Sequence, residues 1–233
     1  MSAPLTTTLP DGRKVSIDPG AADRLSCGVV VLDPVTVDDS TAAADAAEAL
    51  GADLRTIFAD LQPSQIPALA EARNLYKSFG MDPSRHRPSS EALLRRLLKG
   101  KGLYRISNVV DTCNLASIEF QLPIGMYDGG LVQGDVILRV GREGEEYPGI
   151  RKGMVHLAGR LGLFDDEGPF GSPTSDSART CTSVSTGSIL AVVMATASYP
   201  REKMAEHLAV FAARFAQYCA ATCVHRAVLG VAE

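Results

Sequence analysis

The apolar residues of this chain follow two different spacings, and this mixture most constrains the fold. Short continuous apolar runs rich in β-branched residues, such as Cys27–Leu32 and Ile189–Ala195, are typical of buried strands. A stretch near the C-terminus instead has apolar residues at helical intervals: Met204, Leu208, Phe211 and Phe215. The two patterns do not alternate regularly. The sequence therefore predicts an α+β fold, with mixed or antiparallel sheets and flanking helices.

Three further helices are expected in the first half of the chain. An alanine-rich segment follows Ser40, and we expect it to end at Gly51. A second helix is expected from Pro63 to about Phe79. The third lies between Ser89 and Gly100 and has a leucine-rich face.

Composition narrows the class of protein. The chain has 233 residues, 45% of them hydrophobic, which suffices for a sizeable core. We expect one fold, with residues 1–68 as an acidic strand–helix part and 69–233 as the main domain. No apolar run is long enough to span a membrane, and the N-terminus lacks a signal-peptide pattern. Five scattered cysteines do not suggest a disulfide framework, so we expect a cytoplasmic protein with no cofactor and no metal.

Positive charge is concentrated in one segment, although the whole chain carries a net charge of −4. Arg73 to Arg105 contains nine basic and two acidic residues. Such a block can meet a polyanion, or it can be a solvated helix face whose charges pair with acids elsewhere. If the block binds RNA, the expected residues are Arg85, Arg87, Arg95, Arg96, Lys99 and Lys101.

Polar residues recur at helical spacing within an apolar segment that begins at Ser107. With Ser107 or Asn108 as the N-cap, Asp111, Asn114 and Ser117 form one stripe along a helix. Short polar groups in such a helix need partners. The stripe is therefore either the wall of a pocket or a satisfied structural network.

The same segment resembles the B3/B4 domain of the β subunit of bacterial phenylalanyl-tRNA synthetase. It matches the motif of that domain, without a gap, at Asp111, Asn114, Glu119, Pro123 and Asp128. Other segments resemble free-standing members of the family: Lys77–Pro83, Arg87–Leu94, Asp165–Ser172 and Asp176–Thr180. The resemblance extends from about Leu69 to Gln217.

In the synthetase this domain is an editing module that hydrolyses tyrosine wrongly esterified to the phenylalanine tRNA. The resemblance implies a stand-alone, tRNA-binding domain that recognises aminoacyl-tRNA, or its aminoacyl end, and hydrolyses the mischarged ester in trans. Nothing resembles the adenylate-forming core of the synthetase, so tRNA charging is not expected. Cys113 replaces the threonine of the motif, and Gly125 stands where the synthetase has a histidine. Because this histidine is missing, the alternative interpretation is a non-catalytic module that binds an amino acid, a nucleotide or RNA.

Candidate site residues follow from the stripe and the resemblance. We expect Asn114 to act on the ester and Glu119 or Asp176 to orient a water molecule. Arg179 can hold a phosphate or carboxylate in bidentate fashion. The expected substrate-binding residues are Asp111, Cys113, Ser117, Gly125, Asp128, Arg179 and Thr180.

Overall fold

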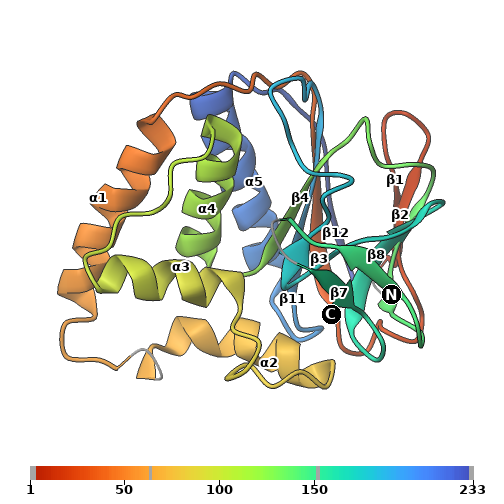
Figure 1. Ribbon diagram of the computed structural model, residues 1–233, viewed down its shortest axis with the longest axis horizontal. Coiled ribbons are helices and arrows are strands. Elements are labelled where there is room, and N and C mark those ends of the chain that lie inside the picture. Colours follow the sequence, from red (N-terminus) through yellow and green to blue (C-terminus); the bar gives the residue numbers. More distant parts are fainter. Residues whose placement is uncertain (1–3, 63–64, 151–152, 231–233) are drawn as a thin grey trace.

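A central antiparallel sheet separates a layer of helices from a second sheet in this computed structural model, which describes residues 4–62, 65–150 and 153–230 (Figure 1). The described strands of the central sheet follow the order β12-β3-β11-β4. They are β3 (Ser26–Leu32), β4 (Ile124–Asp128), β11 (Ile189–Ala195) and β12 (Cys223–Leu229). Every residue of β11 is buried, because the strand is covered on both faces. Both predicted strand runs thus form the middle of this sheet.

The second sheet has the strand order β1-β2-β5-β8-β9-β10, in which only the described pair β2–β5 is parallel. Its strands are β1 (Thr6–Thr8), β2 (Lys14–Ile17), β5 (Val136–Val140), β8 (Leu161–Asp165), β9 (Gly168–Ser172) and β10 (Ser175–Asp176). A small hairpin joins β6 (Glu146–Pro148) and β7 (Met154–His156). Val15, Leu138 and Leu163 of the second sheet share one core with Val29 and Val192 of the central sheet.

The helices are α1 (Ala42–Ile57), α2 (Ala70–Ser78), α3 (Ser89–Leu98), α4 (Asn108–Phe120) and α5 (Arg201–Cys219), with a 3₁₀ turn, η2, at Pro67–Leu69. Of these, α4 and α5 cover the opposite face of the central sheet, and α1 and α3 pack against α4 (Figure 1). Leu75 of α2 instead belongs to the core between the two sheets. The predicted apolar stripe of α5 is buried against the sheet. A Cβ at Gly28 of β3 would lie 2.4 Å from Leu208, so glycine allows α5 to approach closely. The combination of helices and sheets confirms the α+β prediction.

Two predicted helix boundaries are wrong. The alanine-rich helix does not end at Gly51 but continues to Ile57. A Cβ at Gly51 would lie 3.0 Å from Leu97, so this glycine serves close packing of α1 on α3 rather than termination. The helix expected from Pro63 begins at Ala70, and Pro63 itself lies outside the described residues.

The N-terminal part of the chain, before α1, contributes strands to both sheets. β2 pairs with β5, and β3 lies between β12 and β11. α1 packs against α3 and α4. Within the described ranges, no helix combines the length and the apolar character needed to cross a membrane.

Candidate functional site

A cavity of about 450 Å³ lies between α4, α3, β4 and the β9–β10 hairpin. Its size falls within the range of about 300–1,000 Å³ that is usual for small-molecule sites. Its described walls combine apolar side chains, hydroxyl groups, two thiols, one amide and one carboxylate: Ser89, Leu93, Ile106, Val110, Cys113, Asn114, Ser117, Ile124, Met126, Ile150, Ser172, Pro173, Thr174, Ser175, Asp176, Cys181 and Thr182. The predicted residues Cys113, Asn114, Ser117 and Asp176 therefore meet at one cavity.

Helix α4 supplies the wall that carries Asn114. The Ser107 side chain accepts a hydrogen bond from the Val110 backbone N–H, which confirms this serine as the N-cap. Asn114 and Ser117 lie one turn apart on the cavity side, and the Ser117 hydroxyl donates to the Leu122 carbonyl at 2.8 Å. Asp111 does not line the cavity. It is buried and accepts a hydrogen bond from the Ile106 backbone N–H at 3.3 Å, so only part of the predicted stripe is a pocket wall.

Asp176 reaches the cavity from the β9–β10 hairpin, where it pairs with Gly171. Buried tyrosines anchor the connecting residues of this hairpin. The Tyr76 hydroxyl donates to the Pro173 carbonyl at 2.6 Å, and the Tyr147 hydroxyl donates to Ser172 Oγ at 2.9 Å.

The surroundings of the Asp176 carboxylate suppress ionisation of its neighbours. Burial raises the pKa of Tyr76, Tyr127 and Tyr147, and the negative charge of Asp176 raises each further. The same two causes raise the pKa of the Cys113 thiol. All four groups are therefore neutral at pH 7, and Asp176 is the one acidic side chain among the described residues that line the cavity.

Gly125 does not leave an empty place in the cavity wall. Its neighbours Ile124 and Met126 line the cavity, whereas a Cβ at position 125 would collide with the Tyr127 hydroxyl. The space expected for a histidine side chain is thus filled by a tyrosine from the same strand.

Two acidic residues of the motif hold the fold together outside the cavity. Glu119 forms an ion pair with Arg214 and thereby joins α4 to α5. Asp128 accepts hydrogen bonds from the Thr186 hydroxyl at 2.5 Å and the Gly130 backbone N–H at 3.0 Å. Neither residue is positioned to orient a water molecule in the cavity.

Arg179 and Thr180 also lie outside the cavity walls. Arg179 binds the Asp165 carboxylate with both terminal nitrogens, at 2.8 and 3.0 Å, and contacts Glu167 at 3.1 Å. Thr180 is fully buried, and its carbonyl accepts a hydrogen bond from the Asp128 N–H. The guanidinium predicted to hold a ligand is therefore already engaged by two carboxylates.

Comparison with known proteins places the chain in a family. The profile of the B3/4 domain matches residues 71–222, a stretch that contains every described residue lining the cavity. The chain belongs to the B3/4 domain family. No curated protein matches it.

This B3/4 domain is also similar to a solved structure, an N-terminal fragment of the phenylalanyl-tRNA synthetase β subunit from Pyrococcus horikoshii. The two share 13% sequence identity with a TM-score of 0.47. The alignment covers 90% of this chain and 49% of the fragment, so the chain spans about half of the fragment's length.

The basic segment of this B3/4 domain surrounds a buried acid. The Glu91 side chain is only 2% exposed and accepts hydrogen bonds at 2.7 Å from Arg73, in bidentate fashion, and from Arg95. Arg87 approaches it at 3.9 Å. Burial works to raise the pKa of Glu91, but the hydrogen bonds from Arg73 and Arg95 outweigh burial and lower it. These contacts support the structural alternative for Arg87 and Arg95.

The remaining predicted RNA-binding residues differ in their surroundings. Arg85 is exposed and lies 3.7 Å from Asp82. Arg96 donates to the Gly102 carbonyl at 2.6 Å. Lys99 and Lys101 are exposed and have no ion pair among the described residues.

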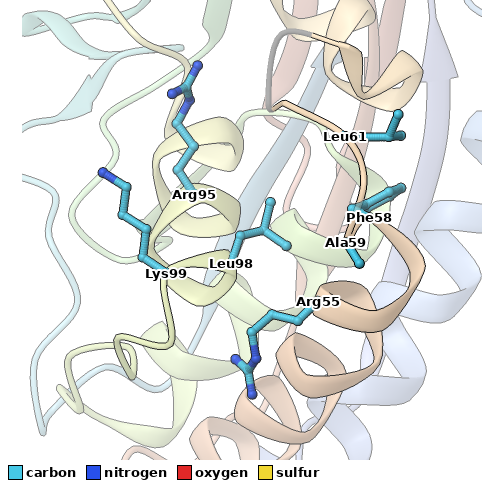
Figure 2. A pocket seen from close by; sticks show the side chains of 7 residues that line it. All are labelled: Arg55, Phe58, Ala59, Leu61, Arg95, Leu98 and Lys99. Atoms are coloured by element: carbon cyan, nitrogen blue, oxygen red, sulfur yellow. The ribbon is translucent and has the colours of Figure 1, made fainter.

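A second hollow, of about 420 Å³, separates the C-terminal ends of α1 and α3. Figure 2 shows Leu98 facing Phe58 across it, with Arg95 on the same helix as Leu98 and Lys99 directly after the end of that helix. Arg55 donates to the Leu97 carbonyl at 2.9 Å and so satisfies the end of α3. None of the motif residues between Asp111 and Asp128 lines this hollow, so the cavity beside α4 remains the candidate site.

Sequence reasoning missed several cavity residues. Pro173, Thr174 and Ser175 line the cavity because the β9–β10 turn folds over α4, and Ile150 and Cys181 reach it from separate loops. A signal for the hairpin was present, since Gly171–Asp176 is rich in turn-forming residues just before the predicted Asp176. No local signal marks Ile150.

Proposed function

We infer that this B3/4 domain binds aminoacyl-tRNA and hydrolyses the ester that joins the amino acid to the terminal ribose. The observation that carries this proposal is the meeting of Asn114 and Asp176, which are distant in sequence, at one cavity of small-molecule size. The apolar walls formed by Leu93, Val110 and Met126 suit an apolar amino-acid side chain. We propose that the protein acts in the cytoplasm, where its tRNA substrate would be met.

The proposed reaction needs no side-chain nucleophile, because an aminoacyl ester is already activated. The oxygen of a water molecule attacks the ester carbonyl carbon, and the Asp176 carboxylate accepts the proton from that water. The Asn114 amide N–H donates to the oxyanion of the tetrahedral intermediate. The bond between the carbonyl carbon and the ribose oxygen then breaks, and the proton held by Asp176 passes to the ribose oxygen. The products are a free amino acid and uncharged tRNA.

Cys113 is an unsuitable nucleophile although it lines the same cavity. Its thiol is buried, and burial together with the Asp176 charge raises its pKa. A thiol needs to lose its proton to attack a carbonyl carbon. We therefore assign Cys113 to the binding wall only.

A deacylation screen against a panel of mischarged tRNAs tests the proposal. With the substrate that responds, Asn114→Ala should slow the single-turnover rate by about 10²- to 10³-fold and leave tRNA affinity nearly unchanged. Asp176→Asn should also slow deacylation, because the amide cannot accept the proton. Glu202→Gln, an exposed change in the first turn of α5, serves as the control and should retain the parent rate. Absence of deacylation above buffer with every tRNA would refute hydrolysis.

A non-catalytic binding module is the second candidate. It is favoured by the replacement of the expected histidine by Gly125 and by the engagement of the Ser117 hydroxyl with Leu122. For such a module, Asn114→Ala should weaken affinity for the aminoacyl ligand instead of slowing a reaction. Titration of the parent and the variant with a non-hydrolysable aminoacyl-adenosine amide distinguishes the two candidates.

A further inference from the structure

The connection between α3 and α4 presents large apolar side chains to solvent. Tyr104 is 70% exposed and Ile106 is 59% exposed. Both lie close to the N-terminal end of α4, whose next turns form the cavity wall. Exposed side chains of this size within one short segment require an explanation, because burial of apolar surface stabilises a fold.

A cation packs against one face of the Tyr104 ring. The Arg96 guanidinium carbon lies 4.1 Å from the ring centroid, and Arg96 is itself fixed by its hydrogen bond to the Gly102 carbonyl at 2.6 Å. The contact is a cation–π interaction that orients the ring. With 70% of the residue exposed, the opposite face of the ring is left to solvent.

The surroundings of Tyr104 are positively charged. Lys99 and Lys101 are exposed on the same connection and form no ion pair within the described part of the chain. Arg105 contacts Asp45 at 2.7 Å, so one cation is compensated by α1. An aromatic ring flanked by cations is the arrangement that proteins use to bind single-stranded nucleic acid, with stacked bases and neutralised phosphates.

This surface adjoins the cavity at Ile106. Ile106 is itself a cavity wall residue, and Ser89 and Leu93 bring α3 to the same rim. Two residues of extended chain span at most about 7 Å, so Tyr104 lies within the length of one nucleotide of the wall at Ile106.

We propose that Tyr104, backed by Arg96, is a stacking platform for a nucleobase at the single-stranded 3′ end of an RNA whose terminal group enters the cavity. This proposal rests on the proposed function for the identity of the terminal group. Lys99 and Lys101 contact the phosphates that precede the stacked base. The RNA end is recognised by base stacking and charge, whereas Asn114 and Asp176 act on the group beyond it.

Fluorescence of a short single-stranded RNA with 2-aminopurine at its 3′-terminal position tests the platform. The chain contains no tryptophan, so the base can be excited without background from that residue. Stacking on Tyr104 should quench the fluorescence of the parent complex at low salt. Tyr104→Ala should weaken binding roughly 5- to 100-fold and abolish the quench, whereas Tyr104→Phe should retain both.

Matched controls make the outcome specific. Ile57→Ala removes another exposed apolar side chain, at the end of α1, and should leave affinity and quench unchanged. Equal affinity and quench in the parent and Tyr104→Ala would overturn the platform. Absence of a quench in the parent would overturn it too, and is the result expected if Tyr104 binds a protein instead. The RNA carries no ester, so these results do not depend on hydrolysis. Loss of quench in Tyr104→Ala with no deacylation of any tRNA would support the platform and refute the proposed reaction.

Discussion

The hydroxyl oxygen of Tyr127 occupies the space that any side chain at Gly125 would need. A Cβ built at position 125 lies 2.2 Å from this oxygen, and a Cβ at Gly171 of β9 would lie 2.1 Å from it. Two glycines on strands of different sheets therefore accommodate one tyrosine side chain. The packing of Tyr127 requires glycine at position 125, where the motif has a histidine. The motif alone does not show this reason for the glycine.

Gly125→Ala should destabilise the protein by about 1–3 kcal/mol, because the added methyl group overpacks a fully buried position. Urea unfolding measures the change. Gly187→Ala is the control, since a Cβ there meets no atom within 4 Å. Equal unfolding free energies for the parent and Gly125→Ala would show that Tyr127 moves aside freely.

Glu91→Gln should destabilise the protein by about 3–5 kcal/mol at pH 7, because several arginines lose their buried counter-charge. Since the pKa of Glu91 is lowered in the folded state from its ordinary value of 4.5, its contribution is complete above pH 4.5. The contribution is lost as the pH falls through the folded-state value. The gap in unfolding free energy between the parent and the variant should narrow as the pH falls from 4.5 to 3, by at most about 1.4 kcal/mol per pH unit. A gap that stays constant over this range would contradict the linkage.

Glu119→Gln should leave deacylation unchanged and cost about 1 kcal/mol of stability, since the residue joins α4 to α5 through a partly exposed ion pair. Single-turnover deacylation and urea unfolding, measured on the same preparation, separate the two effects. A large loss of rate with unchanged stability would return Glu119 to the catalytic role that its place in the motif suggested.

Reversing the charge of Lys99 and Lys101 together should weaken tRNA binding and make it less dependent on salt. Each lysine that contacts a phosphate adds about 1 to the slope of log affinity against log salt concentration. Gel retardation across a salt series measures this slope. Lys14→Glu, on β2 in the second sheet, reverses one exposed lysine away from α3 and should leave binding and salt slope as in the parent. Arg95 is unsuitable for this test because its reversal would disrupt the ion pair with Glu91.

The sequence by itself determined the elements that have strong local patterns. β11 and α5 appear where the apolar spacing placed them, because period and burial are linked within each element. The N-cap at Ser107 and the turn at Gly100, where φ is 66°, are also determined by the local sequence. The family followed from a gapless motif in α4 and β4, and its profile match confirms it.

Only the tertiary structure decided which polar residues share a cavity. Three acidic residues belong to the same motif as Asn114 but do not line the cavity. Asp111 bonds to Ile106, Glu119 to Arg214 and Asp128 to Thr186, and the spacing of residues in the sequence does not predict these pairs. A side chain's direction depends on how its helix or strand is rotated against the neighbouring layers, and that rotation is set by distant contacts. The same reason explains why Gly51 was mistaken for a helix end and why Tyr127 was not expected beside Gly125. Local propensity fixes an element, whereas long-range packing fixes what the element faces.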